Sequence, residues 1–462
     1  MDRSRALAPI VLAIVLSLAV LALFASWNKP LLYDEYVYFA AAGLPSTGDA
    51  LRAVWETTTN LNQGVTGAFM MADYWLLQGF GAHPGALRFP GLLTGALLLL
   101  YAAVFLIGRR LSLWVLPTIP LVFATQELVL RYVGEARTYM PLAAATIGVL
   151  AYYTLDTAQR KTWWGRSTGW SAVLLGALFH PYFIVYWAAM AVFALLLFRH
   201  GRTLREFVNV PLFMVGLIGY VTIGALTWMR GTANAEVDPF NFLPGPLPVE
   251  IAAQNLYFLT SPIAAVGVIV VFAAPLVAAA RARIPGRVIA RASLAPILLI
   301  GLAFALALVI SASTIVNDFW IFPRQWIAST ALTALAAIWL VAEWWNTGAS
   351  KRESAGTPRS RNRERGVWIL ISAAAIAAMS APSLLIQAEN LRTWDQRPIA
   401  QESNQDELRE RLDSGQVLTD PEWISYAQVN IDLGGRVWPE FGRYYTDIDW
   451  TGFVLRDGSQ TQ

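Results

Sequence analysis

The 462-residue sequence contains no cysteine, which excludes disulfide bonds, thiolate metal sites and cysteine nucleophiles. Histidine is almost as scarce: only His83, His180 and His200 occur, and their separation along the chain argues against a histidine-rich metal site. Only 14% of the residues are charged, compared with about 25% in soluble domains. Together with a hydrophobic content of 56%, this scarcity of charge indicates a polytopic membrane protein.

Long apolar runs are what the sequence has in abundance. Because about 20 apolar residues cross a bilayer as a helix, the runs predict an all-α membrane protein with about eleven transmembrane helices. A cleaved signal peptide is the alternative for the first run, but that run is long and no clear small-residue cleavage site follows it. The fifth and sixth spans are short and nearly fused around His180-Pro181, so ten or twelve spans are alternatives. The expected spans are residues 6–27, 89–108, 112–129, 139–155, 168–179, 182–198, 208–228, 260–280, 293–311, 325–344 and 367–387.

The distribution of charge predicts the orientation of these spans. With the N-terminus on the cytoplasmic side, most of the 34 Lys and Arg residues fall in cytoplasmic segments and most of the 31 Asp and Glu residues in external ones. This bias follows the positive-inside rule and runs through every loop. The expected location is therefore the cytoplasmic (inner) membrane, with the N-terminus inside and the C-terminus outside.

The segments between the spans complete the expected organisation. The long first outer loop, residues 28–88, is expected to carry amphipathic helices, including a short helix at 34–42 and an aromatic segment at 69–75 lying in the membrane interface. Residues 346–366 form a basic linker between two spans. This linker is interpreted as a cytoplasmic topology signal, not as a nucleic-acid-binding segment. The external tail is long enough for a small α/β appendage. The expected division is 1–345 (membrane domain), 346–366 (linker), 367–387 (last span) and 388–462 (tail).

The most informative polar feature is the pair Asp34-Glu35, a few residues after the first span. Charge beside lipid is costly and usually functional. Partial burial suits a carboxylate to act as a general base, because burial raises its pKa. Adjacent side chains on a helix diverge, so we expect Asp34 to face the reaction and Glu35 to support it. An ordinary helix N-cap is the alternative, and it fits an isolated Asp about equally well.

A second polar group lies at the outer end of the fourth span. Here Glu135 and Tyr139 are four residues apart and are expected to share one helix face. Arg137, between them, is suited to an anionic phosphate. A simple topological anchor with an intrahelical ion pair is the alternative, and for this motif alone it is the better interpretation.

Three more motifs lie on the same predicted side. Arg88 opens the second span, His180 and Tyr182 lie between the fifth and sixth, and Arg324 opens the tenth. His180 alone is best interpreted as a hydrogen-bonded residue at a helix break. Three arginines at outer span ends (Arg88, Arg137 and Arg324) run against the positive-inside tendency, however, and together they favour a ligand that carries phosphate.

In their order and sidedness, these motifs resemble those of the GT-C superfamily of polyprenyl-phosphate-sugar-dependent glycosyltransferases. Within it, the chain looks most like the protein O-mannosyltransferase and lipid A aminoarabinose transferase group. The resemblance covers roughly residues 1–345. Two positions depart from the family pattern: Thr138 stands where a proline usually separates the arginine from the tyrosine, and Gln325 stands where tyrosine often follows the arginine. The matching motifs are Asp34-Glu35, Arg88-Phe89-Pro90, Glu135-Ala136-Arg137-Thr138-Tyr139, His180-Pro181-Tyr182 and Pro323-Arg324-Gln325-Trp326.

The resemblance implies an inverting hexosyl- or pentosyltransferase that acts on the outer face of the membrane. Its donor would be a sugar linked through phosphate to a polyprenol, and its acceptor a glycan, a lipid or a protein. Asp34 would take the acceptor's proton while Arg137 and Arg324 stabilise the leaving phosphate. A divalent metal, which some members use, stays an alternative, but no clear carboxylate cluster in this sequence demands one. The remaining contacts to donor phosphate or sugar would come from Arg88, Glu135, Tyr139, His180 and Tyr182.

Two other classes of function stay open. A transporter or lipid flippase would need ionisable groups in mid-membrane and often an internal repeat. The expected spans are nearly free of charge and show no repeat, which disfavours this class. A non-catalytic assembly protein on the same scaffold is the other alternative. The absence of a glycine-rich nucleotide-binding motif argues against an ATPase, and no nucleic-acid partner is expected.

Overall fold

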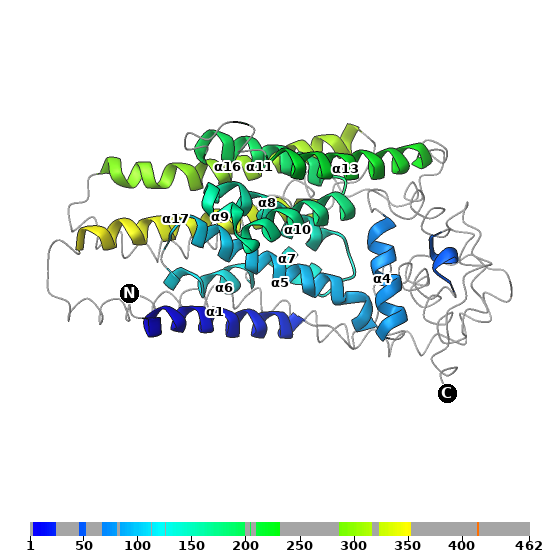
Figure 1. The fold of residues 1–462 in the computed structure, drawn as a ribbon, viewed down its shortest axis with the longest axis horizontal. Helices are drawn as coiled ribbons and strands as arrows, with labels where there is room; N and C mark the ends of the chain where they lie inside the picture. The colour runs from blue at the N-terminus through cyan, green and yellow to red at the C-terminus, as the bar shows by residue number, and fades with distance from the viewer. Residues whose placement is uncertain are drawn as a thin grey trace.

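The computed structural model describes residues 3–24, 46–51, 67–80, 84–111, 113–124, 126–198, 204, 209–231, 286–316, 323–352 and 414. All regular structure within these ranges is helical, and most of the helices run along the long axis of the molecule (Figure 1). Asp34-Glu35, the expected spans 260–280 and 367–387 and, apart from residue 414, the tail lie outside the described residues.

The helices follow the apolar runs of the sequence. Their bounds are α1 (Arg3–Phe24), α4 (Gly67–Phe80), α5 (Pro84–Gly108), α6 (Thr118–Ala124), α7 (Glu127–Val133), α8 (Tyr139–Thr154), α9 (Thr157–Lys161), α10 (Trp163–Phe179), α11 (Phe183–Phe198), α13 (Val210–Gly231), α16 (Gly286–Val316) and α17 (Ile327–Arg352), with 3-10 turns η1 (Leu113–Val115) and η2 (Pro323–Trp326).

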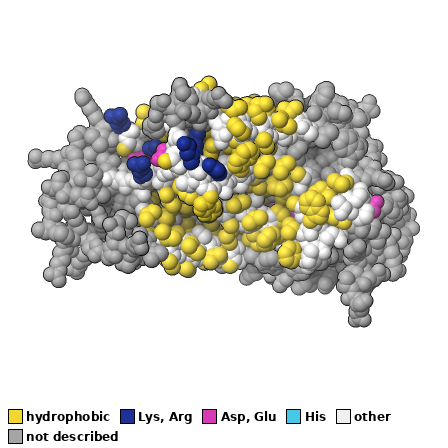
Figure 2. Space-filling model, viewed as in Figure 1, with side chains coloured by type: hydrophobic (Ala, Val, Ile, Leu, Met, Phe, Trp, Pro, Cys, Tyr) yellow, Lys and Arg dark blue, Asp and Glu magenta, His cyan; other side chains and the backbone are white. Residues whose placement is uncertain are grey.

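The protein is a membrane protein with apolar helices. By length and hydropathy, three described segments can cross a membrane: Gly85–Gly108, Arg291–Ala312 and Arg324–Glu343. Shorter apolar helical stretches lie at Pro9–Ala22, Phe183–Phe198 and Val210–Thr222. Figure 2 shows hydrophobic side chains covering the middle of one face, whereas Lys and Arg side chains gather toward one end of it.

Helix α8 forms the centre of the bundle. Its residues from Met140 to Thr154 are buried, and it packs against α5, α10, α11 and α17. At Gly148 the neighbouring helices come so close that a Cβ atom would lie 2.6 Å from Ala172 Cβ and 2.8 Å from the ring of Tyr101. Small residues allow such close packing, which matters in a membrane because lipid is as apolar as the side chains and gives little drive for helix association.

The directions of α5 and α10 follow from their contacts along α8. Gly91 of α5 lies against the backbone just before α8, and Gly108 lies against Leu155 just after it, so α5 and α8 run parallel. Helix α10 runs antiparallel to α8, because His180 at its C-terminal end meets Tyr139 at the start of α8.

Helices α11 and α17 also run parallel to α8. Arg324, just before α17, lies over Tyr139, while Glu343 near the other end of α17 pairs with Arg109 at the end of α5. Phe198, the last residue of α11, lies under the Arg109 guanidinium at 4.6 Å. The starts of α5, α8, α11 and α17 therefore meet at one end of the bundle, which we call the α8-start end.

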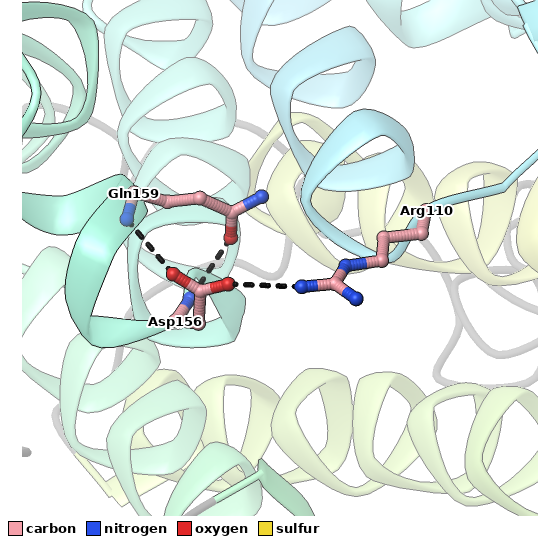
Figure 3. Close-up of polar contacts among 3 residues, drawn as sticks. All are labelled: Arg110, Asp156 and Gln159. Carbon is pink, nitrogen blue, oxygen red and sulfur yellow. Dashed lines mark hydrogen bonds and ion pairs between the residues drawn. The ribbon is translucent and has the colours of Figure 1, made fainter.

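Ion pairs hold the opposite end together. Arg110 Nη2 lies 3.4 Å from Asp156 Oδ2, and the same aspartate caps α9 by accepting a hydrogen bond from the backbone N–H of Gln159 (Figure 3). The Gln159 side chain in turn accepts from the Asp156 backbone N–H, which completes a capping box. Beside them, Arg109 Nη2 lies 3.5 Å from Glu343 Oε1. Arg109 and Arg110 thus each lie beside a carboxylate at this end, whereas Arg160 donates to the carbonyl oxygen of Tyr153.

Two details of the expected spans can be compared with these helices. The break around His180-Pro181 is confirmed, because α10 ends at Phe179 and α11 begins at Phe183. The expectation of one continuous span at 112–129 is wrong: η1, α6 and the start of α7 occupy this stretch. Pro117 precedes α6 and Pro120 lies in its first turn, and proline cannot donate the backbone hydrogen bond that a longer helix would need there.

The close approach at Gly91 gives a test of the packing. In the Gly91→Ala variant the new Cβ would lie 2.8 Å from the carbonyl oxygen of Val133 and 3.0 Å from that of Glu135. Because backbone atoms cannot yield cheaply, we expect a loss of about 1–3 kcal/mol, measured as a lower Tm of the detergent-solubilised protein.

Gly301→Ala in α16 is the matched control, since nothing lies within 4 Å of its added Cβ. Alanine favours a helix by about 1 kcal/mol over glycine, so this variant should match or exceed the wild-type Tm. A Gly91→Ala protein as stable as the Gly301→Ala protein would contradict the packing described here.

Candidate functional site

The candidate site lies at the α8-start end and is built on four aromatic rings. The ring of Tyr139, the first residue of α8, has its centroid 5.1 Å from that of Tyr132 on α7 and 5.6 Å from that of His180. The ring of His180 lies 5.3 Å from that of Tyr182. Rings from α7, α8 and the α10–α11 connection thus form one contiguous cluster.

Two arginines adjoin this aromatic cluster. The guanidinium carbon of Arg324 lies 5.7 Å from the centroid of the Tyr139 ring, within the range of a cation–π interaction. Arg137 is close enough to Arg324 for their charges to repel: burial first, and then this neighbour, lower the pKa of Arg137 to about 9. This pKa is still above neutral pH, so Arg137 stays charged. Two cations held together in this way favour the binding of an anion.

The helix starts add to the positive potential. Helices α5, α8, α11 and α17 all begin at the α8-start end. The first N–H groups of an α-helix have no partner within the helix, and the helix dipole places partial positive charge there. Anions bind readily at such positions. Helices α7 and α10 end here, however, so the partial charges of helix starts and helix ends offset each other. The arginine pair is therefore the feature of this end that favours negative charge.

His180 adds a neutral hydrogen-bond donor to this positive site. It is buried, and burial lowers the pKa of its imidazole to about 3, so the ring is uncharged at neutral pH. The backbone N–H of Tyr182 donates to His180 Nδ1 at 3.2 Å, which requires Nδ1 to be the unprotonated nitrogen. The proton therefore sits on Nε2, and the Nε2–H group can donate to a ligand.

Glu135 is arranged differently from the expectation. Helix α7 ends at Val133 and is followed by Gly134, while α8 begins only at Tyr139, so Glu135 lies in a turn and does not share a helix face with Tyr139. Glycine commonly ends a helix in this way. Arg131 Nε donates to Glu135 Oε1 at 2.8 Å, which gives this carboxylate a cationic partner on α7.

The structure also places Arg88 at the α8-start end. It lies in the first part of α5 and is only 2% exposed. Gly91, one turn later, lies against the carbonyl oxygen of Glu135, so this part of α5 adjoins the turn that carries Arg137. Of the residues singled out from the sequence, Arg88, Glu135, Arg137, Tyr139, His180, Tyr182 and Arg324 thus share one end of the bundle. Asp34 and Glu35 lie outside the described residues.

Sequence reasoning missed a buried acid near this site. Asp73 on α4 is 0% exposed and follows Phe69 by one helical turn. The ring of Phe69 contacts that of Phe179, the last residue of α10, at 5.9 Å. The signal was available, because Asp73 is the only charged residue in the apolar segment Gly67–Phe80. The expectation that 69–75 lies in the interface did not identify this burial.

The described residues hold no group of three or more His, Cys, Asp or Glu side chains that could bind a metal ion. The chemistry that they can supply is electrostatic: two arginines, a neutral imidazole donor and phenol groups. Burial and the neighbouring Glu135 raise the pKa of Tyr132 well above its ordinary value, so that phenol stays protonated.

Comparison with known proteins gives matches at the level of structure. ArnT from Cupriavidus metallidurans in the apo state matches with a TM-score of 0.44 and 16% identity, over 95% of this chain and 77% of ArnT. The same protein bound to undecaprenyl phosphate matches with a TM-score of 0.42 and 15% identity over the same shares. The archaeal oligosaccharyltransferase AglB from Archaeoglobus fulgidus, in complex with an inhibitory peptide and a dolichol-phosphate, gives 0.41 and 13%, over 82% of this chain and 55% of AglB.

The chain is thus similar in structure to these proteins over most of its length, at low sequence identity. No protein-family model matches the sequence, and no curated protein matches it either.

The neutral state of His180 predicts a pH dependence of stability. The unfolded chain binds a proton at His180 below its ordinary pKa of 6.5, whereas the folded chain binds it only near pH 3. The stability that this group contributes is therefore fully present above pH 6.5 and is lost as the pH falls toward 3, by at most about 1.4 kcal/mol per pH unit.

The measurement compares Tm at pH 7.5 and pH 5 for the wild type and for His180→Asn, which cannot titrate in this range. We expect the wild type to lose more Tm between the two pH values than the variant does. Equal losses would show that His180 is not held neutral by burial.

Proposed function

We propose that the protein is an integral membrane glycosyltransferase that moves a sugar from a polyprenyl-phosphate donor to an acceptor at the outer face of the cytoplasmic membrane. The observation that carries this proposal is the arginine pair, Arg137 and Arg324, held beside Tyr139 where four helices begin. An apolar bundle with a positive site at one end suits a ligand that has a lipid tail and an anionic head group.

In the proposed reaction an oxygen or nitrogen of the acceptor attacks the anomeric carbon as its proton passes to a general base. The bond between this carbon and the phosphate oxygen breaks, and the electron pair leaves with the polyprenyl phosphate. Attack opposite the leaving group inverts the anomeric centre. The base that we assign from the sequence is Asp34, with Glu35 beside it.

The leaving phosphate gains negative charge as the bond breaks, and this is the charge that Arg137 and Arg324 would stabilise. Groups held ready for charge that develops in the transition state make a large contribution to catalysis. The Nε2–H of His180 and the phenols of Tyr139 and Tyr182 would donate to oxygens of the phosphate or the sugar. Arg88 would contribute a further positive charge at the same end of the bundle.

The proposed topology follows from the charge distribution of the sequence. With the N-terminus in the cytoplasm, the α8-start end faces outward and the opposite end, with Arg109 and Arg110, faces the cytoplasm. The acceptor, whether a glycan, a lipid or a protein, would then approach from outside. The polyprenol tail would lie among membrane lipids against the apolar flank of the bundle.

Removal of one arginine should impair the transfer. We expect Arg324→Gln to lower the transfer rate by about a hundredfold or more, because loss of one group that stabilises developing charge has an effect of that size. The assay uses membranes supplied with polyprenyl-phosphate sugars and follows the release of polyprenyl phosphate.

Arg110→Gln is the matched control, since its exposed pair with Asp156 lies at the opposite end and contributes little. If Arg324→Gln and Arg110→Gln membranes transferred sugar equally fast, the leaving-group role of Arg324 would be refuted.

The assignment of the base is tested separately. A deletion strain should accumulate a polyprenyl-phosphate sugar and lack one sugar in its surface glycans or glycolipids, as measured by mass spectrometry. We expect wild-type protein and Asp156→Asn to restore the missing sugar, whereas Asp34→Asn at the same membrane level should not. Full restoration by Asp34→Asn would exclude Asp34 as the base, and an unchanged deletion strain would exclude the glycosyltransferase function.

A further inference from the structure

Three buried polar side chains at or near the α8-start end make no hydrogen bond in the described part of the chain. They are Thr138, 1% exposed, Trp326, 5% exposed, and Thr330, 1% exposed. The atoms concerned are the two Oγ1 hydroxyls and the indole Nε1. Buried polar groups are nearly always hydrogen-bonded, and a buried group without a partner is destabilising.

Comparable side chains elsewhere in the bundle do have partners. Thr146 donates to the carbonyl oxygen of Leu142 at 2.8 Å, and Thr333 donates to that of Ser329 at 2.9 Å. The indole N–H of Trp187 donates to the hydroxyl of Tyr153 at 3.0 Å. The fold therefore readily satisfies a buried threonine or tryptophan, and the lack of partners is specific to the first three residues.

Thr138 is unusual for its position. It is the N-cap of α8, where a threonine hydroxyl ordinarily accepts a hydrogen bond from the first turn of the helix, but here the side chain makes no capping bond. It stands between Arg137 and Tyr139 in the sequence, so its backbone adjoins the arginine pair. The GT-C pattern has proline at this position, so the hydroxyl is a feature of this chain.

Trp326 and Thr330 approach from the other side of the same junction. Trp326 ends the 3-10 turn that carries Arg324, whose guanidinium lies over Tyr139. Thr330 follows one helical turn later on α17, and residues four apart share a helix face. Helix α17 packs against α8, so these donors lie on the element that faces Thr138.

The chemistry of the three groups restricts the ligand. An indole N–H can only donate, so Trp326 requires an acceptor, and the two hydroxyls can donate as well. Hydrogen bonds to ionised acceptors are shorter and about twice as strong as those between neutral groups. An anion beside the arginine pair is the kind of acceptor to which each of the three groups can donate.

We propose that Thr138, Trp326 and Thr330 complete the binding site by donating hydrogen bonds to oxygens of the phosphate that Arg137 and Arg324 hold. This inference rests on the proposed function in taking the ligand to be a polyprenyl phosphate. The three side chains add specificity without adding charge, and they make phosphate binding a property of α8 and α17 together.

The test measures the Kd of farnesyl phosphate for the purified, detergent-solubilised full chain, using the rise in Tm with ligand concentration. Three variants remove one donor each: Thr138→Val and Thr330→Val keep the volume nearly unchanged, and Trp326→Phe, which leaves a smaller ring, is matched by Trp187→Phe below. We expect each to weaken binding by about tenfold to a hundredfold, the usual range for a lost hydrogen bond to a charged group. Thr138→Ser keeps the hydroxyl and should bind as the wild type does.

Thr146→Val and Trp187→Phe are the matched controls, because they remove donors that already have protein partners. They should leave the Kd unchanged even where they lower the Tm of the free protein. Farnesol, which lacks the phosphate, should bind equally to every variant. Methyl mannoside is the third probe, and its binding should not depend on the three donors.

The outcomes separate this inference from the proposed function. Wild-type protein that binds farnesyl phosphate no better than farnesol would overturn both. Tight wild-type binding with no loss in the three variants would overturn the inference alone and leave buried water as the partner of these groups. Equal losses in variants and controls, or a loss confined to methyl mannoside, would also overturn it.

Discussion

The repulsion between Arg137 and Arg324 is the constraint that the rest of this structure must offset. Burial makes the charge of Arg137 costly, and Arg324 lies close enough at this end of the apolar bundle for the two charges to repel. Such an arrangement is unfavourable by itself and persists only where the surroundings hold it in place. The nearly complete burial of α8 and the close approach of α5 at Gly91 supply that rigidity, and the Tyr139 ring gives Arg324 a favourable contact.

The opposite end of the bundle shows how arginine side chains are placed where only stability is required. There Arg109 lies beside Glu343 and between aromatic rings, and Arg110 lies beside Asp156. Ion pairs of this kind are common at helix ends, and exposed pairs contribute little to the stability of the fold. At the α8-start end Glu135 likewise pairs with Arg131, while Arg137 and Arg324 lie close enough for their charges to repel. The proposed function rests on this close pair of cations.

The sequence was sufficient for features that depend on local composition. Apolar runs predicted most of the described helices because a chain in lipid must pair its backbone groups within each helix. The proline after His180 marked the break between α10 and α11. The sequence was insufficient where a turn or a tertiary contact decides the position of a residue. Glu135 leaves the helix because α7 stops at Gly134, and the burial of Asp73 depends on the packing of α4 against neighbouring helices.

The site itself could be predicted as a set of residue types but not as an arrangement. The predicted topology places Arg137 and Arg324 at the outer ends of two spans, but nothing in the sequence indicates that these spans are neighbours, which is what brings the arginines together. The sequence singled out Thr138 only as a departure from the family pattern and Trp326 only as part of the motif around Arg324, since a threonine or tryptophan at a membrane boundary is commonplace.

The neutral state of His180 bears on whether the proposed site favours the breaking of the phosphate bond or tight binding of the donor. A lipid-linked sugar phosphodiester carries one negative charge, and the polyprenyl phosphate that leaves carries up to two. A positive site that holds Arg137 and Arg324, with Arg88 at the same end of the bundle, can match the second charge more closely than the first. A protonated imidazole would add a further cation and strengthen the binding of the substrate as well as that of the product. Because only interactions that grow stronger toward the transition state accelerate the chemical step, a buried His180 with a pKa near 3 favours the breaking of the phosphate bond over tight binding of the donor.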